Sequence, residues 1–265
     1  AVVTLTGSGA HLRDGNRTPE HPYRPFRDIA GALAGCGVAT LRLDDRGTGG
    51  STGDANAATA EDTAADARAA LRFLRARPDI DPRRVALVGH SYGGVIAPMV
   101  AAEDPAVAAV VLLGGPARTF RETMRYQHRY RIENDAAIPA ADREAALAEA
   151  MRQQEANVAA SPEAWRRSIQ DRDPLATARR LRMPVLILQG LTDRAVEPGD
   201  AARLEAAIRK GGNRRVKRVL FPEVNHHFQR DPIGAREGYD RLPDQRLAPE
   251  VLSALCAWLP ASLRR

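Results

Sequence analysis

Short runs of apolar residues alternate along this chain with longer segments in which apolar residues recur every three or four positions. The short runs are rich in valine, leucine and isoleucine, which is typical of strands that are buried on both faces. The longer segments have the periodicity of amphipathic helices. This alternation predicts an α/β fold in which a mostly parallel, twisted sheet carries helices on both faces. The predicted strands span residues 2–6, 38–43, 85–88, 107–113, 184–188 and 216–221.

The predicted helices lie between these strands, and the segment 59–77 has the clearest helical pattern. Pro78 ends that segment, because proline lacks the backbone N–H that a helix interior requires. The other helices are predicted at 26–36, 95–102, 201–210 and 249–258. The residues that recur at helical spacing within 59–77 are Ala60, Ala64, Ala67, Leu71 and Leu74.

The alternation is interrupted between residues 118 and 182, where the sequence is charged and helical and contains no candidate strand. A long segment inserted between two strands is typically a functional cap or lid. We therefore expect a first part of the α/β core at 1–117, a helical cap at 118–182, and a second part of the core at 183–265. Phe120 and Met124 fall on one helical face, which favours cap packing over a cofactor site.

One serine stands at the corner between a predicted strand and a predicted helix, in the sequence VALVGHSYGG at residues 85–94. A residue at so tight a turn has a strained backbone, and its neighbours two positions away must lack a Cβ to avoid collision. Gly89 and Gly93 satisfy this requirement around Ser91. The turn exposes the serine hydroxyl above the sheet, and the new helix directs its N-terminal amides at developing negative charge. Ser91 is therefore the candidate nucleophile.

A serine hydroxyl needs a base to take its proton, and the base needs an acid to orient it. His226 and His227 follow the last predicted strand, and Asp193 follows the strand before it. The order Ser91, Asp193, His226 is the one expected for a parallel α/β hydrolytic enzyme. We take His226 as the base, with His227 as the alternative. If Asp193 merely caps the next helix, Glu197 and Asp200 are substitute acids.

The net charge of +6 does not alter the predicted function. The basic residues are scattered among acidic ones and form no dense block with aromatic residues. We expect no nucleic-acid partner. No apolar stretch approaches the length of a membrane-spanning helix, so we expect no membrane insertion. Cys36 and Cys256 both lie in apolar helical contexts, which favours buried thiols over a bridge. The two cysteines also form no metal motif.

The glycine-rich sequence RGTGGSTG at 46–53 raises the question of a nucleotide cofactor. A dinucleotide fingerprint that starts at Gly47 has Thr52 where its third glycine belongs, and one that starts at Gly7 has Leu12 there. No phosphate-binding loop sequence and no zinc-binding His-Glu-x-x-His occurs. We therefore expect neither a cofactor nor a metal.

Taken together, these motifs resemble those of the α/β-hydrolases, in particular the bacterial serine esterases that carry GSGP after an early strand. The matching sequences are LTGSGAHLRDGN, LRLDDRGTGGSTGD, VALVGHSYGGVIAPMVAAEDP, LILQGLTD and VNHHF. The third is the most specific, because it extends well beyond the serine pentapeptide. Two departures are Ala10 in place of the usual proline and the absence of the strands that normally precede Ala1.

The resemblance implies an oxyanion hole made of backbone N–H groups. One donor is expected from Tyr92, and the other from Ser8, with Gly9 as the alternative. The resemblance also implies that Asp44, Asp45 and Arg46 are ion-pair scaffolding and not catalysts.

The implied activity is hydrolysis of small carboxylic esters, with short acyl chains favoured, through an acyl-enzyme intermediate. The alternatives are a peptidase or amidase, a thioesterase, and a non-catalytic binding module on the same fold. Leu191, Phe120 and Met124 are candidate pocket residues. The oligomeric state stays open. For the compartment we favour the cytoplasm, with a secreted or periplasmic location as the alternative because Ala1 is compatible with a processed start.

Overall fold

The sheet has six strands in the order β2-β1-β3-β4-β5-β6, and every neighbouring pair is parallel. The computed structural model describes residues 1–264 of the chain. This arrangement confirms the parallel α/β sheet that the sequence predicts. The strands are β1 Val2–Leu5, β2 Thr40–Leu41, β3 Ala86–His90, β4 Val110–Leu113, β5 Val185–Gly190 and β6 Val216–Phe221.

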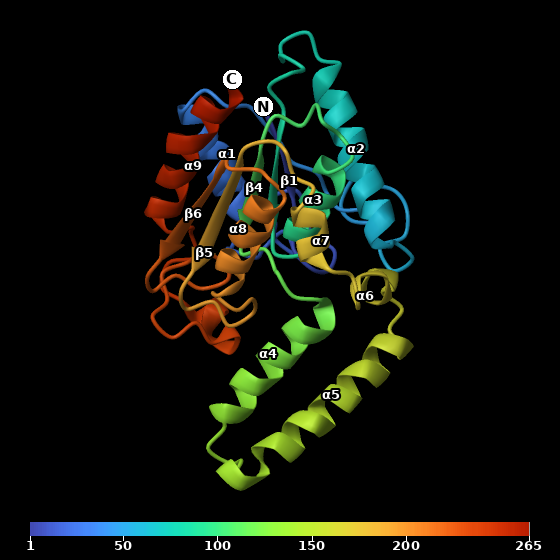
Figure 1. Cartoon of the computed structure of the whole chain (residues 1–265), viewed down its shortest axis with the longest axis vertical. Coiled ribbons are helices and arrows are strands. Elements are labelled where there is room, and N and C mark those ends of the chain that lie inside the picture. The colour runs from blue at the N-terminus through green and yellow to red at the C-terminus, as the bar shows by residue number, and fades with distance from the viewer. Residues whose placement is uncertain (265) are drawn as a thin grey trace.

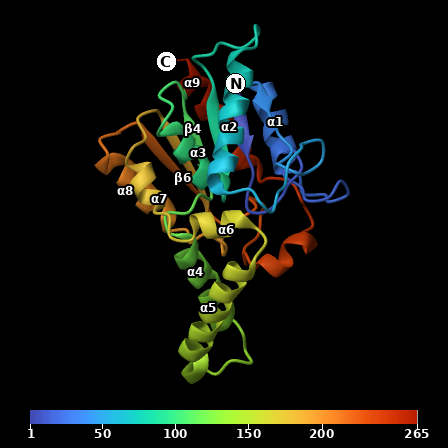
Figure 2. The same ribbon diagram turned by 90° about the vertical axis from the view of Figure 1, so that its right-hand side faces the viewer.

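Helices cover both faces of this sheet (Figures 1 and 2). On one face, α1 Pro25–Gly35 packs beside α9 Pro249–Leu263. On the other lie α2 Ala60–Arg75, α3 Gly93–Ala101, α7 Pro174–Ala178 and α8 Asp200–Lys210.

Alternate residues of each central strand belong to two different hydrophobic clusters. In β4, Val110 and Leu112 belong to the cluster that includes residues of α2 and α3, whereas Val111 and Leu113 belong to the cluster that includes residues of α1 and α9. Successive side chains of a strand point to opposite faces, so a strand covered on both sides must be apolar throughout. Burying each of these side chains contributes about 2 kcal/mol. The continuous apolar runs in the sequence follow from this double burial.

The edge strand β2 is shorter than predicted. Residues 38–43 are expected to form a strand, but only Thr40 and Leu41 pair with β1. Beyond them the chain turns away, because the Asp45 N–H bonds to the His11 carbonyl at 2.9 Å and a loop begins.

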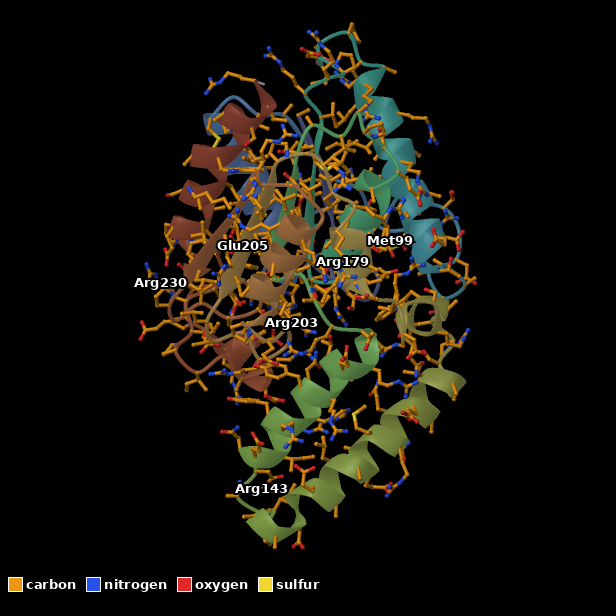
Figure 3. The ribbon with its side chains drawn as sticks, viewed as in Figure 1. Met99, Arg143, Arg179, Arg203, Glu205 and Arg230 are labelled. Carbon is orange, nitrogen blue, oxygen red and sulfur yellow. A yellow bond between two sulfur atoms is a disulfide. The ribbon has the colours of Figure 1, made fainter. Side chains whose placement is uncertain are left out.

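Two helices of the inserted segment form a hairpin that projects from the rest of the molecule (Figures 1 and 2). They are α4 Phe120–Glu133 and α5 Arg143–Ala160, joined through the 3₁₀ turn η1 Ala140–Asp142. Arg143 lies at the end of the hairpin that is far from the sheet (Figure 3). The hairpin has a small core of its own, made of Ile132, Leu147 and Met151.

The chain returns from the hairpin through α6 Ala164–Ile169 and α7. Helix α7 falls within the segment 118–182, yet Ala178 and the following Leu181 are buried in the main hydrophobic cluster beside α3 and α8. The C-terminal end of that segment therefore packs with the core. No helix within residues 1–264 is both long enough and apolar enough to span a bilayer.

Cys36 and Cys256 form a disulfide, which corrects the expectation of two buried thiols. Cys36 caps the end of α1 and Cys256 lies in α9, and the two helices pack side by side on the same face of the sheet. Their Cα atoms are 5.8 Å apart, within the usual range for a disulfide. The sequence separation of 220 positions concealed this proximity.

Candidate functional site

Ser91 stands directly after β3 and before α3, with a positive φ of 54°. Few residues other than glycine adopt this conformation, so the corner has the strain that the sequence predicts. A Cβ on Gly89 would collide with the Gly93 carbonyl, and one on Gly93 would collide with the Leu5 carbonyl. The Ser91 N–H bonds to the Leu113 carbonyl at 2.9 Å, which ties the corner to β4.

The structure brings Ser91, His226 and Asp193 together in one hydrogen-bonded chain. His226 Nε2 lies 2.9 Å from Ser91 Oγ, and His226 Nδ1 lies 2.8 Å from Asp193 Oδ2. Each residue comes from a loop at the carboxyl end of a strand: β3 for Ser91, β5 for Asp193 and β6 for His226. Parallel strands place these ends at one edge of the sheet, which is why residues 33 to 135 positions apart meet.

Asp193 is fully buried and accepts several hydrogen bonds. Its Oδ1 accepts the N–H groups of Ala195 and Val196, both at 2.8 Å. Its Oδ2 accepts from Gln189 Nε2 at 2.9 Å as well as from His226. These bonds fix the direction of the carboxylate toward the imidazole.

The substitute acids Glu197 and Asp200 have other partners. Both form ion pairs with Arg118, and Asp200 also accepts the Ala117 N–H at 2.9 Å. Neither carboxylate bonds to His226. Among the three candidates, only Asp193 meets the imidazole.

His227 is placed differently from His226, although the two are adjacent. Its ring stacks on Tyr23, with centroids 4.4 Å apart, and its carbonyl accepts the Tyr23 hydroxyl at 2.9 Å. Desolvation lowers the pKa of His227 well below its usual value, and the neighbouring His226 adds to the effect. His227 forms no hydrogen bond with Ser91 or Asp193.

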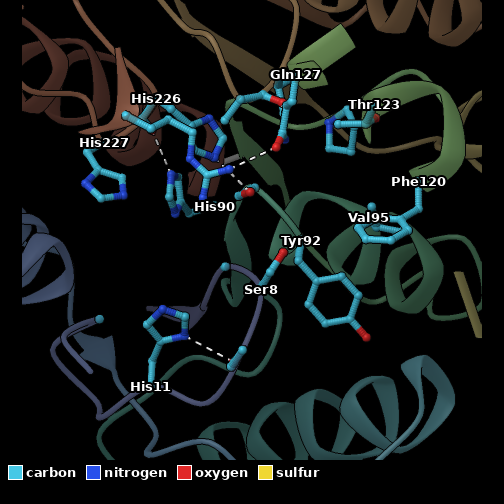
Figure 4. Close-up of a pocket in the computed structure, with 18 of the residues that line it drawn as sticks. Ser8, His11, His90, Tyr92, Val95, Phe120, Thr123, Gln127, His226 and His227 are labelled. Carbon is cyan, nitrogen blue, oxygen red and sulfur yellow. Dashed lines mark hydrogen bonds between the residues drawn. The ribbon is translucent and has the colours of Figure 1, made fainter. Parts of the chain in front are cut away.

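His90 supports the site in a way that the sequence did not reveal. Its Nε2–H donates to the backbone carbonyl of His226 at 2.9 Å (Figure 4). Desolvation, together with the nearby His226, lowers the pKa of His90 to about 3, so the ring stays neutral at physiological pH. Its position directly before the corner serine is the only sequence signal that singles it out.

Both expected oxyanion donors, with the alternative Gly9, line the same space as Ser91. Ser8, Gly9 and Tyr92 all line one cavity with Ser91, and within residues 1–264 their backbone N–H groups have no acceptor. Asp45 anchors the first loop from below, because it accepts the Thr6 hydroxyl at 2.8 Å and the His11 N–H at 2.9 Å. These two bonds fix both ends of the loop that carries Ser8 and Gly9.

Asp44 and Arg46 take part in the same scaffold. Asp44 is buried and accepts the Arg13 guanidinium at 2.6 Å, and this partner lowers the Asp44 pKa to about 2. Arg46 instead pairs with Asp66 on α2 at 2.6 Å. Neither side chain contacts Ser91 or His226.

The cavity has a volume of about 780 Å³ and lies between the carboxyl ends of the strands and helix α4. Phe120 and Met124 line it as expected, and Tyr92 points its hydroxyl away from the histidines (Figure 4). Leu191 does not line it, which corrects that expectation. The Leu191 N–H continues the sheet by bonding to the Phe221 carbonyl, and the side chain is 40% exposed to solvent.

Helix α4 is bonded to the loop that carries Asp193, a contact that the sequence did not predict. The Tyr126 hydroxyl donates to the Asp193 carbonyl at 3.0 Å, and Gln127 Nε2 donates to the Ala195 carbonyl at 2.8 Å. Across the described chain, His, Cys, Asp and Glu side chains form no cluster of three suited to holding a metal ion.

Most of the chain is similar to known proteins. A model of the family described as serine aminopeptidase, S33, matches residues 20–233, a range that contains Ser91, Asp193 and His226. Esterase EstD of Thermotoga maritima is 28% identical over 231 residues, which cover 85% of this chain and 54% of EstD. The chain therefore spans about half the length of this relative.

Solved structures share the fold at low sequence identity. Est1E from Butyrivibrio proteoclasticus, solved with ferulic acid, has a TM-score of 0.64 and 17% identity, covering 100% of this chain and 89% of Est1E. Pyrococcus furiosus esterase Pf2001 has a TM-score of 0.61 and 16% identity, covering 98% of this chain and 82% of that one. The α/β-hydrolase fold is thereby confirmed. The narrower likeness to GSGP-type esterases stays a prediction.

Proposed function

Since the chain belongs to the family described as serine aminopeptidase, S33, we propose that it is a serine hydrolase that cleaves small carboxylic esters. The observation that carries this proposal is the hydrogen-bonded chain from Ser91 Oγ through His226 to Asp193. Each link has a length that permits proton transfer or charge-assisted bonding.

In the acylation step, Ser91 Oγ attacks the ester carbonyl while His226 Nε2 takes the serine proton. The imidazolium that forms donates its Nδ1–H to Asp193, whose negative charge stabilises it. The tetrahedral intermediate collapses when the alcohol leaves with the proton from His226. An acyl group stays bound to Ser91.

In the deacylation step, His226 takes a proton from water, and the resulting hydroxide attacks the acyl carbonyl. The second intermediate releases the carboxylic acid and returns the proton to Ser91. In both steps the carbonyl oxygen becomes negative, and the backbone N–H groups of Tyr92 and of Ser8 or Gly9 stabilise it. Each such donor is worth about 10²- to 10³-fold in rate.

A cavity of about 780 Å³, lined on one side by α4, has the size of a site for a small-molecule ester. Phe120 and Met124 offer it apolar surface, and Ser91 lies at its base. We assign the projecting part of 118–182 the role of a cap, whose contacts Tyr126–Asp193 and Gln127–Ala195 hold it over the site.

A peptidase is the second candidate, because the family description names an aminopeptidase. The same triad cleaves amides, but the leaving amine needs a well-placed proton donor and the free α-amine of a peptide needs an acid to bind it. Comparing aminoacyl 4-nitroanilides with 4-nitrophenyl esters separates the two activities. A thioesterase would favour acyl thioesters in the same comparison.

The test is labelling with a fluorophosphonate probe, run beside turnover of 4-nitrophenyl esters from acetate to octanoate. We expect labelling at Ser91 that is lost in Ser91→Ala, with turnover that declines as the acyl chain lengthens. Asp193→Asn should lower kcat by about 10⁴-fold, since an amide N–H that donates to Nδ1 leaves the proton on Nε2, where the imidazole cannot act as the base. Near-normal rates in Asp193→Asn would refute the assigned acid. A folded protein that neither labels nor hydrolyses esters would refute the proposed function and favour a binding module.

A further inference from the structure

Five arginines line the cavity that contains Ser91, and three of them are neutralised by acidic side chains. Ion pairing is thus the usual arrangement for an arginine at this site. The three paired residues are Arg118 with Glu197 and Asp200, Arg166 with Glu163, and Arg172 with Glu61.

Arg236 is one of the two exceptions. It opens the 3₁₀ turn η2 Arg236–Arg241, and its Nη1 donates to the neutral side-chain oxygen of Gln127 at 2.9 Å. Gln127 is itself held by the Ala195 carbonyl, so one nitrogen of the solvent-exposed Arg236 is tied to α4. Within residues 1–264 no carboxylate pairs with Arg236, and its Nε–Nη2 edge has no acceptor.

Arg17 is the second exception, on the opposite wall. Its Nη2 donates to the Ser8 carbonyl at 3.3 Å, and the same nitrogen would lie 3.5 Å from a Cβ on Gly9. The guanidinium therefore sits against the loop assigned to the oxyanion hole. No acidic side chain of the described residues forms an ion pair with it.

Three acidic side chains also line the cavity, and two of them have partners. Glu163 binds Arg166 at 2.5 Å, and Asp240 lies 3.2 Å from His21 Nε2. Glu237 is exposed and forms no ion pair among the described residues. Outside the ion pairs, the lining thus holds two arginines, Arg17 and Arg236, against the one carboxylate of Glu237, and both arginines line the same cavity as Ser91.

From this arrangement we propose that Arg17 and Arg236 select esters that carry a carboxylate in addition to the scissile group. This inference rests on the proposed function, because it assigns a substrate class to the same site. A guanidinium offers two parallel N–H donors that match the two oxygens of a carboxylate. The other three cavity arginines each pair with a carboxylate of the protein. A substrate carboxylate would pair in the same way with Arg17 and Arg236.

The experiment compares each anionic ester with a neutral amide of the same shape. On the alcohol side, the pair is 4-acetoxybenzoate and 4-acetoxybenzamide. On the acyl side, it is monomethyl glutarate and the methyl ester of glutaric acid monoamide. We expect kcat/KM to favour the carboxylate by about tenfold or more in at least one pair, as a charge-assisted hydrogen bond provides. The pair in which kcat/KM favours the carboxylate shows whether the arginines bind the alcohol part or the acyl part of the ester.

Variants attribute the preference to the two side chains. In Arg236→Gln or Arg17→Gln the ratio of the two kcat/KM values should fall toward one, and the corresponding lysine variant should restore part of it. Arg172→Gln is the matched control, because Arg172 lines the same cavity but is already bound to Glu61 at 2.7 Å. Its ratio should stay that of the wild type. High salt should lower the wild-type ratio, since screening weakens accessible charge pairs.

Two results separate failure of this inference from failure of the proposed function. If Ser91 is labelled and neutral esters are hydrolysed as well as or better than the anionic ones, the substrate class is refuted and the hydrolase stands. An anionic preference that survives in both glutamine variants refutes the role of the two arginines. If Ser91 is neither labelled nor active, the proposed function fails and the inference fails with it.

Discussion

The Tyr126 hydroxyl donates a hydrogen bond to the backbone carbonyl of Asp193, with 3.0 Å between the oxygens. Tyr126 belongs to α4 in the inserted segment, whereas the buried carboxylate of Asp193 bonds to His226 Nδ1 and is the acid of the proposed triad. Burial raises the pKa of Tyr126, so the hydroxyl remains a donor at neutral pH. The inserted hairpin is therefore bonded to the loop that carries the acid.

Removing this bond should slow catalysis without abolishing it. In Tyr126→Phe the ring stays and the donor is lost, which costs about 1 kcal/mol and lowers kcat about fivefold. Because the effect acts through the position of Asp193, KM should change little. Tyr130→Phe is the matched control on the same helix, since its ring still lies under the Arg194 guanidinium. Equal kcat values in both variants would contradict the coupling.

The two adjacent histidines should differ sharply in their effect on turnover. His226→Ala removes the base that bonds to Ser91 and should lower kcat by about 10⁴-fold or more. His227→Ala removes a ring that stacks on Tyr23 and should mainly reduce stability. Steady-state kinetics with 4-nitrophenyl acetate and thermal melts of both variants distinguish these effects. An inactive His227→Ala beside an active His226→Ala would reverse the assignment.

The Cys36–Cys256 bridge should stabilise the fold and leave catalysis unchanged. It connects α1 to α9 across 220 residues, and closing so long a loop restricts the unfolded chain. Loss of the bridge should cost about 2–4 kcal/mol, which lowers Tm by roughly 5–10 °C. The measurement is calorimetry with and without dithiothreitol. The double variant Cys36→Ser/Cys256→Ser should melt at the lower temperature in both conditions, with wild-type kcat at 25 °C.

His90 should make the fold sensitive to mild acid. Its pKa is about 3 in the folded protein and 6.5 when unperturbed, so between these values the unfolded chain binds a proton that the folded chain does not. The free energy of unfolding is therefore highest above pH 6.5 and falls as the pH decreases toward 3. The slope from this one group approaches about 1.4 kcal/mol per pH unit.

The check is urea unfolding between pH 7 and pH 5, a range in which most carboxylates stay ionised. His90→Gln places an amide N–H near the position of the ring Nε2–H and does not titrate. Its free energy of unfolding should decline less steeply with acid than that of the wild type. Parallel slopes for the two proteins would show that His90 does not contribute.

Much of the fold was predictable because its causes are local in the chain. The apolar runs predicted six parallel strands, since a strand covered on both faces must be apolar along its whole length. The sharp corner at Ser91 was predictable for a similar reason. Only residues without a Cβ fit at Gly89 and Gly93, and the structure shows which carbonyls they approach.

The candidate site was predictable in its residue types and chain order. A nucleophile, an acid and a base each follow a predicted strand, and parallel strands bring their carboxyl ends to one edge. The predicted ends of strands were less accurate where they depend on residues distant in the sequence. Strand β2 is shorter than its apolar run because Asp45 bonds to the His11 backbone and turns the chain away.

The sequence by itself therefore determined the sheet, its helical layers and the order of Ser91, Asp193 and His226, since these follow from periodicity and sterics along the chain. Only the tertiary structure decided that Cys36 meets Cys256, that Leu191 faces solvent, and that Tyr126 reaches Asp193. The same holds for the two unpaired arginines of the cavity. All of these features involve segments far apart in the chain. They depend on how helices and loops pack together in three dimensions.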